Sequence, residues 1–226
     1  IGLSAEDINQ RFKVEATDGY HPRYNAAPTQ LLPVITNQHP NGFSFFYWGQ
    51  VPQWSNNRAI SGKLLNAEAE QIIEKATLKN ALINKRCLVP ADGFYAWQII
   101  GKKSKVPHRF ILNQKIPFAM AGLWEEYEDD KDQVVHTFRI ITTPSNEIVA
   151  GANQRMPAIL SPENESAWLN DQRDVDNLMG MLKPFPAESM GSYTISSQIN
   201  SIKIDRPELL SPAPANDQFG NYTLFS

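Results

Sequence analysis

The fold is decided by one stretch of the sequence, Arg86-Cys87-Leu88-Val89-Pro90-Ala91-Asp92-Gly93-Phe94-Tyr95-Ala96-Trp97. Apolar and aromatic residues lie on both sides of a Pro-Ala-Asp-Gly turn, which predicts two strands within 86–99. A turn between two apolar runs fixes the direction of the side chains that follow it. We therefore expect the side chains of Tyr95, Ala96 and Trp97 to shape a functional site. The residue at position 96 decides whether the chemistry of this site is present or missing.

The composition is that of a globular protein that can bury a core. The chain has 226 residues, of which 42% are apolar and 20% are charged. The net charge of -3 argues against a generally basic nucleic-acid binder but leaves room for a local basic groove. No apolar run approaches the roughly 18 residues that span a membrane. A single cysteine favours a reducing cytoplasm, and a first residue other than Met leaves open a start of translation upstream.

Short apolar runs separated by turns predict one α+β domain over residues 1–226, dominated by antiparallel strands with helices at its edges. Further strands are expected at 31–36, 43–48, 109–112, 118–124, 137–142 and 155–160. The first two of these are expected to pair through a turn at His39-Pro40-Asn41-Gly42. Helices are expected at 4–12, 66–82, 144–149 and 174–182, and after the Ser161-Pro162 start signal.

The general motifs of cofactor and metal sites are missing from the sequence. It has no glycine-rich nucleotide loop, no His-Glu-x-x-His and no Cys-x-x-Cys. The four histidines are scattered, so we expect neither a metal site nor a cofactor. Cys87 lies between apolar neighbours, and we interpret it as a small core residue rather than a nucleophile.

Seven short motifs carry more information than any general motif. They are Arg23-Tyr24-Asn25-Ala26-Ala27-Pro28, Trp48-Gly49 with Pro52 and Trp54, Asn66-Ala67-Glu68-Ala69-Glu70, Pro90-Ala91-Asp92-Gly93-Phe94-Tyr95 with Trp97, Ala121-Gly122-Leu123-Trp124, Arg155-Met156-Pro157-Ala158-Ile159-Leu160 and Asp205-Arg206-Pro207-Glu208-Leu209. In this order and spacing the chain closely resembles the SRAP family, the SOS-response-associated peptidases or abasic-site processing proteins, over essentially its whole length.

The resemblance implies a mainly antiparallel, barrel-like fold with peripheral helices, and a covalent reaction with damaged DNA. Members of the family bind single-stranded DNA and recognise abasic sites. The cysteine after the initiator methionine forms a thiazolidine with the aldehyde of the ring-opened sugar, because its amine and thiol both close on one carbon. Removal of the methionine frees that cysteine. An asparagine, a glutamate and a histidine orient and protonate the sugar.

The supporting residues are only partly present in this chain. The family asparagine matches Asn66, for which capping of a following helix is the alternative. The glutamate position holds Ala96 and the histidine position holds Asn153, and neither side chain transfers a proton near pH 7. Two places after the asparagine, Glu68 replaces a common basic residue and would repel phosphate. We expect Ala96 to face a cleft near Asn66 and Asn153. The resemblance places the cysteine about three residues before Ile1.

Four residues are candidates for DNA binding. Arg155 and Arg23 suit phosphate contacts, although an internal salt bridge is an equal alternative for Arg23. Trp54 suits stacking on a base, with a place in the core as the alternative. Asn25 is expected to order the loop near the site or to contact a nucleotide. Lys102 and its lysine neighbours fit a solvated hairpin tip better than a DNA track.

Three functional hypotheses follow, in decreasing order of support. The first is an abasic-site sensor that crosslinks slowly to single-stranded DNA through the upstream cysteine. The second is a DNA-binding protein of the same fold that has lost crosslinking. The third is a peptidase acting on other proteins, which ranks last because no Ser/His/Asp or Cys/His set is apparent. We expect a monomer in the cytoplasm, associated with the nucleoid if the source is bacterial.

Overall fold

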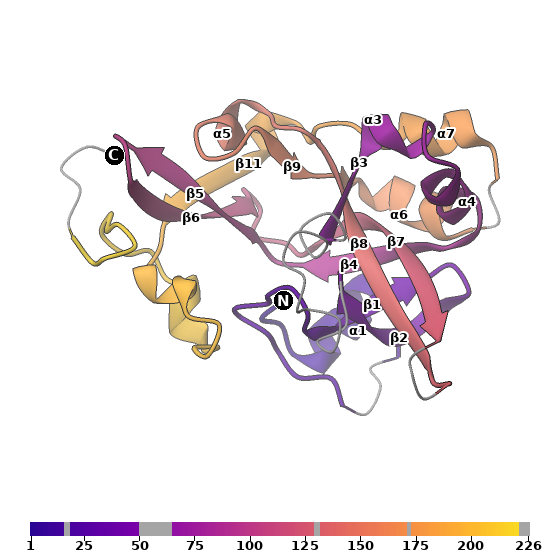
Figure 1. Ribbon diagram of the computed structural model, residues 1–226. Helices are drawn as coiled ribbons and strands as arrows, with labels where there is room; N and C mark the ends of the chain where they lie inside the picture. The colour runs from indigo at the N-terminus through magenta and orange to yellow at the C-terminus, as the bar shows by residue number, and fades with distance from the viewer. Residues whose placement is uncertain (16–18, 50–64, 129–131, 171–172, 222–226) are drawn as a thin grey trace.

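The Asp92-Gly93 turn passes the chain from one β-sheet to another. In a computed structural model, which describes residues 1–15, 19–49, 65–128, 132–170 and 173–221, it joins β4 (Arg86–Ala91) to β5 (Phe94–Ile100) (Figure 1). All six residues of β4 are buried. β4 pairs within a large sheet and β5 within a small one, so the two predicted strands are confirmed but they do not pair with each other. The sheets therefore diverge at this turn.

The larger sheet contains a closed ring of strands. β4 pairs with β1 and β7, β1 pairs with β2, β2 with β8, and β8 returns to β7. Pairing is antiparallel except for β2 and β3, which each run parallel to β8. The remaining members are β1 (Leu31–Thr36), β2 (His39–Trp48), β3 (Asn66–Glu68), β7 (Phe118–Glu128), β8 (Val134–Pro144), β9 (Arg155–Pro157) and β10 (Ile159–Leu160). The expected barrel-like, mainly antiparallel α+β fold is confirmed.

The smaller sheet has the order β11-β6-β5 and supports the C-terminal segment. It adds β6 (Ser104–Leu112) and β11 (Met190–Thr194) to β5. Short 3-10 turns η3 (Ser197–Asn200) and η4 (Pro207–Leu210) pack on one face through Ile199 and Leu209, against Tyr95 and Trp97. The opposite face of β5 contributes Ala96 to the main core, as the alternation of side chains along a strand requires.

Most helices gather at the end of the large sheet that lies away from the small one (Figure 1). The helices are α1 (Ala5–Phe12), α3 (Ala69–Ile72), α4 (Ala76–Asn84), α5 (Glu147–Ala150), α6 (Pro162–Leu169) and α7 (Val175–Gly180), and η2 (Ala187–Ser189) is a 3-10 turn. Ser4 caps α1 by accepting a hydrogen bond from the Asp7 N–H, and the Asp174 carboxylate caps α7. Ser161 occupies the N-cap position of α6 with Pro162 after it, as expected, and its side chain makes no capping hydrogen bond. No helix in the described part of the chain is long and apolar enough to cross a membrane.

Arg86 ties two of these helices to the sheet. Its side chain is 1% exposed. The guanidinium donates to the carbonyl oxygens of Leu82 and Ile83 in α4, each at 2.7 Å, and to those of Trp168 and Asn170 at the end of α6, at 2.7 and 2.6 Å. Carbonyls at helix C-termini lack partners within the helix, so one cation satisfies the ends of two helices.

Three expected elements differ from the structure. The expected strand at 155–160 is divided at Ala158 into β9, which pairs with β8, and β10, which pairs with β7. The hairpin between β1 and β2 turns at Asn37-Gln38, where Thr36 pairs with His39, so the expected turn at 39–42 is wrong and those residues extend β2. The expected helix over 66–82 is also wrong at its start. Asn66 lies in β3 opposite Ile140, because pairing with β8 outweighs local helix preference.

The interpretation of Cys87 as a core residue is confirmed. Its side chain is fully buried, and burial raises the pKa of the thiol well above its ordinary value. Across the strands, Gly122 lies directly opposite, and a Cβ there would come within 2.8 Å of the sulfur.

Replacement of Arg86 by methionine tests the helix-end contacts. We expect Arg86→Met to lower the free energy of unfolding by about 3–5 kcal/mol, because two buried and two partly buried carbonyl groups lose their donor. Urea denaturation should show a lower midpoint with an unchanged slope. The exposed Lys79 on α4 provides the control, and Lys79→Met should change stability by less than about 0.5 kcal/mol. A loss below about 1 kcal/mol for Arg86→Met would contradict the assignment.

Candidate functional site

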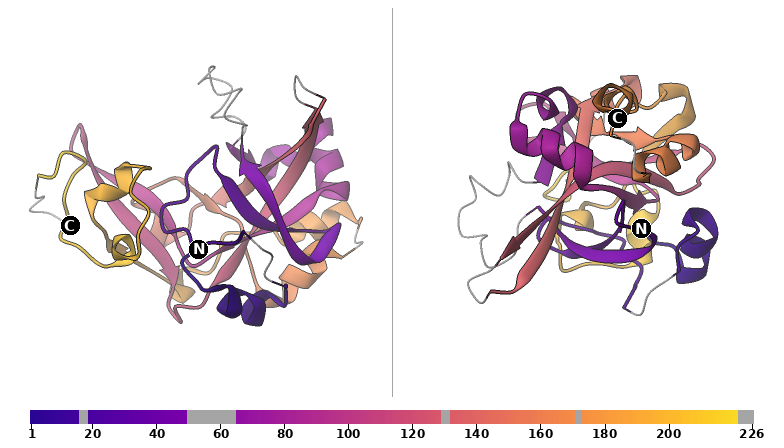
Figure 2. Two further views of the ribbon diagram at one scale, coloured as in Figure 1. Left: turned by 90° about the horizontal axis from the view of Figure 1, so that it is seen from below. Right: turned by 90° about the vertical axis from the view of Figure 1, so that its right-hand side faces the viewer.

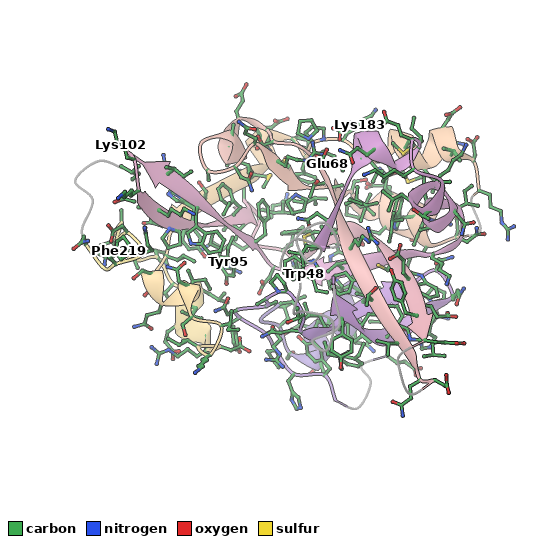
Figure 3. All side chains as sticks on the ribbon, in the orientation of Figure 1. Trp48, Glu68, Tyr95, Lys102, Lys183 and Phe219 are labelled. Carbon is green, nitrogen blue, oxygen red and sulfur yellow. The ribbon has the colours of Figure 1, made fainter. Side chains whose placement is uncertain are left out.

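A cavity of about 1050 Å³ opens where the two sheets diverge. Figure 3 labels Trp48 of β2, Glu68 of β3 and Tyr95 of β5, and all three residues line the cavity. The other lining residues come from segments far apart in the sequence: the first residue, the loop at 21–28, residues 32–33, the rest of β3, positions between 71 and 78 on the helical side, the turn at 89–97, parts of β7 and β8, residues 153–157 and residues 199–202. The fold therefore brings most of the sequence motifs to one place.

The beginning of the chain is fixed at this cavity. The Ile1 nitrogen donates to the Arg23 carbonyl at 2.8 Å, and the Arg23 N–H donates back to the Ile1 carbonyl at 2.9 Å. The Gly2 N–H donates to Asp92 Oδ2 at 2.8 Å. A Cβ at Gly2 would come within 2.9 Å of the Tyr24 ring, so a larger residue would displace this segment. Figure 2 shows the first residues between the two sheets.

Asp92 is held by charge and hydrogen bonds on the other side. Arg109, which is largely buried, contacts the Asp92 carboxylate at 3.2 Å and donates to its carbonyl oxygen at 3.0 Å. The same guanidinium donates to the Tyr193 hydroxyl at 2.7 Å. Nearby, burial raises the pKa of Tyr95 to about 12, so its hydroxyl stays protonated and donates to the Tyr24 carbonyl. This polar network makes the cavity wall rigid.

Asp205 connects the first and last sequence motifs. Its carboxylate accepts hydrogen bonds from the Tyr24 and Asn25 N–H groups at 2.7 and 2.9 Å, and it contacts Arg23 at 3.1 Å. Burial opposes ionisation of this carboxyl, but the two N–H donors and the guanidinium outweigh it, and the pKa of Asp205 lies below its ordinary value. The loop at 23–28 is therefore fixed by the C-terminal segment.

The structure brings together the three positions expected at the reaction centre. Asn66, Ala96 and Asn153 all line the cavity. Asn66 is exposed on β3 and does not cap a helix, since Glu68 occupies the N-cap position of α3. Ala96 is 4% exposed and belongs to the core as well as to the cavity wall. The roles of the three residues stay predictions.

The candidate DNA-binding residues have different surroundings. Arg23 and Arg155 line the cavity, and each is paired with a carboxylate, Arg155 with Glu70 at 2.8 Å. The Asn25 side-chain amide donates to three carbonyls of the C-terminal segment, which supports loop ordering. Trp54 lies outside the described residues. DNA contact stays a prediction for all four.

Two titratable residues near Ala96 and Asn66 were not candidates from the sequence. His108 lies directly opposite Ala96 across β5 and β6, and its buried Nε2 has no hydrogen-bond partner among the described residues. Burial lowers the pKa of His108, so its ring is neutral at pH 7. Glu68 was interpreted only as a replacement that repels phosphate, yet it lies on the cavity wall. The described residues contain no cluster of three or more His, Cys, Asp or Glu side chains suited to a metal ion.

Comparison with known proteins identifies related chains. The family model described as SOS response associated peptidase (SRAP) matches residues 1–202. The chain is 39% identical over 210 residues to abasic site processing protein YoqW of Bacillus subtilis, covering 91% of this chain and 94% of that protein. It is 30% identical over 226 residues to abasic site processing protein HMCES of Gallus gallus, covering 85% of this chain and 67% of that protein.

A solved structure has the same fold. The crystal structure of a protein from Bacteroides thetaiotaomicron matches with a TM-score of 0.76 and 28% sequence identity, covering 94% of this chain and 97% of that chain. A second crystal structure, from Bordetella bronchiseptica, matches with a TM-score of 0.72 at 21% identity and agrees in fold.

The lowered pKa of Asp205 predicts a pH-dependent contribution to stability. A carboxyl whose pKa is depressed by folding stabilises the protein above its unfolded pKa of about 4, and this contribution disappears as the pH falls through the folded value. We expect Asp205→Asn to lower the free energy of unfolding by about 2 kcal/mol at pH 7. The difference from wild type should shrink below about pH 4.

Urea denaturation at pH 7, 5 and 3 measures this effect. Glu188→Gln, at an exposed carboxylate, is the control and should change stability little at any of these pH values. A deficit for Asp205→Asn that is as large at pH 3 as at pH 7 would show that the ionised carboxylate is not its source.

Proposed function

This chain belongs to the SRAP (SOS response associated peptidase) family, and we propose that it captures abasic sites in single-stranded DNA through a covalent bond. One observation carries the proposal: the beginning of the chain, Asn66 and the positions of Ala96 and Asn153 line a single cavity. A cysteine about three residues before Ile1 would reach the cavity, because an extended chain covers at most about 3.5 Å per residue. Relatives named abasic site processing proteins support the choice of lesion.

The proposed reaction joins one aldehyde to one N-terminal cysteine. The amine adds to the aldehyde carbon of the ring-opened sugar and forms a carbinolamine. The hydroxyl leaves as water with a proton, and a carbon–nitrogen double bond forms. The thiol then adds across this double bond. Its sulfur bonds to the same carbon and its proton passes to the nitrogen, which closes a thiazolidine, so the net change is the loss of one water molecule. Removal of the initiator methionine exposes the amine that this reaction requires.

The chain keeps part of the machinery for this reaction. The Asn66 amide lies on the cavity wall and can orient the sugar or the amine by hydrogen bonding. Ala96 has no acidic group and Asn153 does not titrate, so proton transfer is weaker than in relatives with glutamate and histidine. Crosslinking is therefore slow. The glutamate carboxylate and the histidine imidazole that the family resemblance implies would assist the cysteine, whereas the covalent bond itself is formed by the cysteine.

DNA reaches the cavity along its polar rim in this proposal. Arg23 and Arg155 contact phosphates by exchanging their carboxylate partners for phosphate oxygens, since exposed ion pairs contribute only about 0–1 kcal/mol. Asn25 holds the loop that carries Arg23, and Trp54 stacks on a base. The protein acts as a monomer in the cytoplasm and needs no metal or cofactor.

A second candidate function is binding of single-stranded DNA without crosslinking. The observation that favours it is the pair of Ala96 and Asn153, which removes two proton-transfer groups from one cavity. Such a protein would bind undamaged oligonucleotides with an affinity that falls as salt rises, and it would leave no covalent product.

A denaturing gel separates the two functions. Full-length protein is incubated with single-stranded DNA that contains one abasic site, and with the same oligonucleotide undamaged as control. The proposal expects a band of lower mobility that accumulates over hours with the abasic strand only. No shifted band after a day would reject crosslinking. If the protein forms no adduct and also does not bind the undamaged oligonucleotide at low salt, the second function is rejected too.

Restoration of the missing acid provides a sharper test. We expect Ala96→Glu, alone or with Asn153→His, to accelerate adduct formation by about 10- to 100-fold, because general acid–base catalysis contributes at least this much. Ile99→Glu is the matched control, since Ile99 lies on the same strand but is 64% exposed on its other face. Equal rates for Ala96→Glu and Ile99→Glu would show that position 96 does not face the reacting sugar.

A further inference from the structure

Two carboxylates line the cavity within the described part of the chain, and they differ in how they are held. Asp92 accepts a hydrogen bond from the Gly2 N–H and forms an ion pair with Arg109, so its charge stabilises the cavity wall. Glu68 has no arginine or lysine within ion-pair distance among the described residues, and its one hydrogen bond comes from Gln71 Nε2 at 2.7 Å. Its carboxylate is therefore available to a ligand.

Strand geometry directs Glu68 to the same side as Asn66. Both residues belong to β3, and side chains two positions apart lie on one face of a strand. Ala67 between them is buried in the core on the opposite face. Asn66 and Glu68 thus present an amide and a carboxylate side by side to the cavity.

Two of the cations that line the same cavity, Arg155 and Lys75, have their contacts in the structure with residues other than Glu68. Opposite Glu68 on β8 is Thr142, whose hydroxyl and carbonyl accept hydrogen bonds from Arg155 at 3.0 and 2.7 Å. The Arg155 guanidinium pairs with Glu70 and not with Glu68. On the helical side, Lys75 donates to Gln71 Oε1 at 2.6 Å, so the Gln71 amide is oriented to donate toward Glu68.

We propose that Glu68 is the acid–base catalyst of this cavity, in place of the groups that Ala96 and Asn153 do not supply. This inference rests on the proposed function. The Glu68 carboxylate first takes a proton from the ammonium group of the cysteine, and the amine that this frees adds to the aldehyde. Glu68 then gives this proton to the departing hydroxyl of the carbinolamine, the carbon–oxygen bond breaks, and water and an iminium form. The carboxylate takes the proton of the thiol while the carbon–sulfur bond forms and releases it to solvent, so Glu68 ends the reaction as the carboxylate that it was at the start, and one water is released.

The same carboxylate has an opposite effect on binding. A negative charge on the cavity wall repels the phosphates of the strand. Removal of the charge therefore strengthens DNA binding while it removes the proton-transfer group. A residue with a purely structural role would not change these two quantities in opposite directions.

Glu68→Gln tests the proposal, because glutamine keeps the shape and removes the charge. We expect its adduct rate at saturating abasic single-stranded DNA to fall by about 10- to 100-fold in single-turnover gels. Its dissociation constant for the undamaged oligonucleotide, measured by fluorescence anisotropy, should fall by about 2- to 5-fold. Glu68→Asp should retain more of the adduct rate than Glu68→Gln. The unfolding midpoint of each variant shows whether its fold is intact.

Glu74→Gln is the matched control, because Glu74 is exposed, close in sequence and outside the lining of the cavity. It removes the same charge and should change neither the rate at saturation nor the affinity by more than about 2-fold. An unchanged saturated rate in Glu68→Gln, with wild type forming adduct, would overturn the role of Glu68 alone. Wild-type protein without any adduct would overturn the proposed function and this inference together.

Discussion

The buried guanidinium of Arg86 is the interaction on which the rest of the structure depends. It satisfies carbonyls at the ends of α4 and α6 from the first residue of β4. Trp168 returns the contact by donating its indole N–H to the Cys87 carbonyl at 3.0 Å. With β4 fixed between β1 and β7, the Asp92-Gly93 turn has one possible position. Gly93 is required there, because a Cβ would come within 2.8 Å of the Arg109 side chain. The divergence of the two sheets, and with it the cavity, follows from this anchored strand.

The cavity explains why the informative motifs are scattered along the chain. Asp92 fixes the first residues through the Gly2 N–H, and Asp205 fixes the loop that begins at Arg23. Each aspartate joins segments more than 80 positions apart in sequence, as the separations of 90 and 181 residues show. The motifs therefore supply the residues that line one cavity and the hydrogen bonds that hold the lining segments together. Ala96 and Asn153 line that cavity but take no part in these hydrogen bonds, so the proposed loss of proton-transfer groups at the two positions is compatible with the fold.

Sequence patterns predicted the elements that depend on local chemistry. The apolar runs around Asp92-Gly93 and the helix start at Ser161-Pro162 are interpretable from neighbours alone. Features that depend on distant partners were not predicted. Asn66-Ala67-Glu68 is a strand only because β8 lies beside it. β4 and β5 were expected as strands, but they belong to different sheets because each pairs with strands distant in the sequence. The same limit applies to the site. His108 has no local signal, and only the register of β5 and β6 places it opposite Ala96. Glu68 is close to Asn66 in the sequence, but the two side chains share one face only because residues 66–68 form a strand and not a helix.

The buried thiol of Cys87 has a practical consequence for studying this protein in solution. Thiol reagents attack the thiolate, and burial both shields the sulfur and raises its pKa. While the protein is folded, a cysteine introduced at an exposed position will react with a dye or spin label in the presence of an unmodified Cys87. The same thiol also measures opening of the barrel, because it becomes reactive only when β4 separates from β7. The rate of its slow alkylation in native buffer is therefore a direct record of how often the centre of the fold opens.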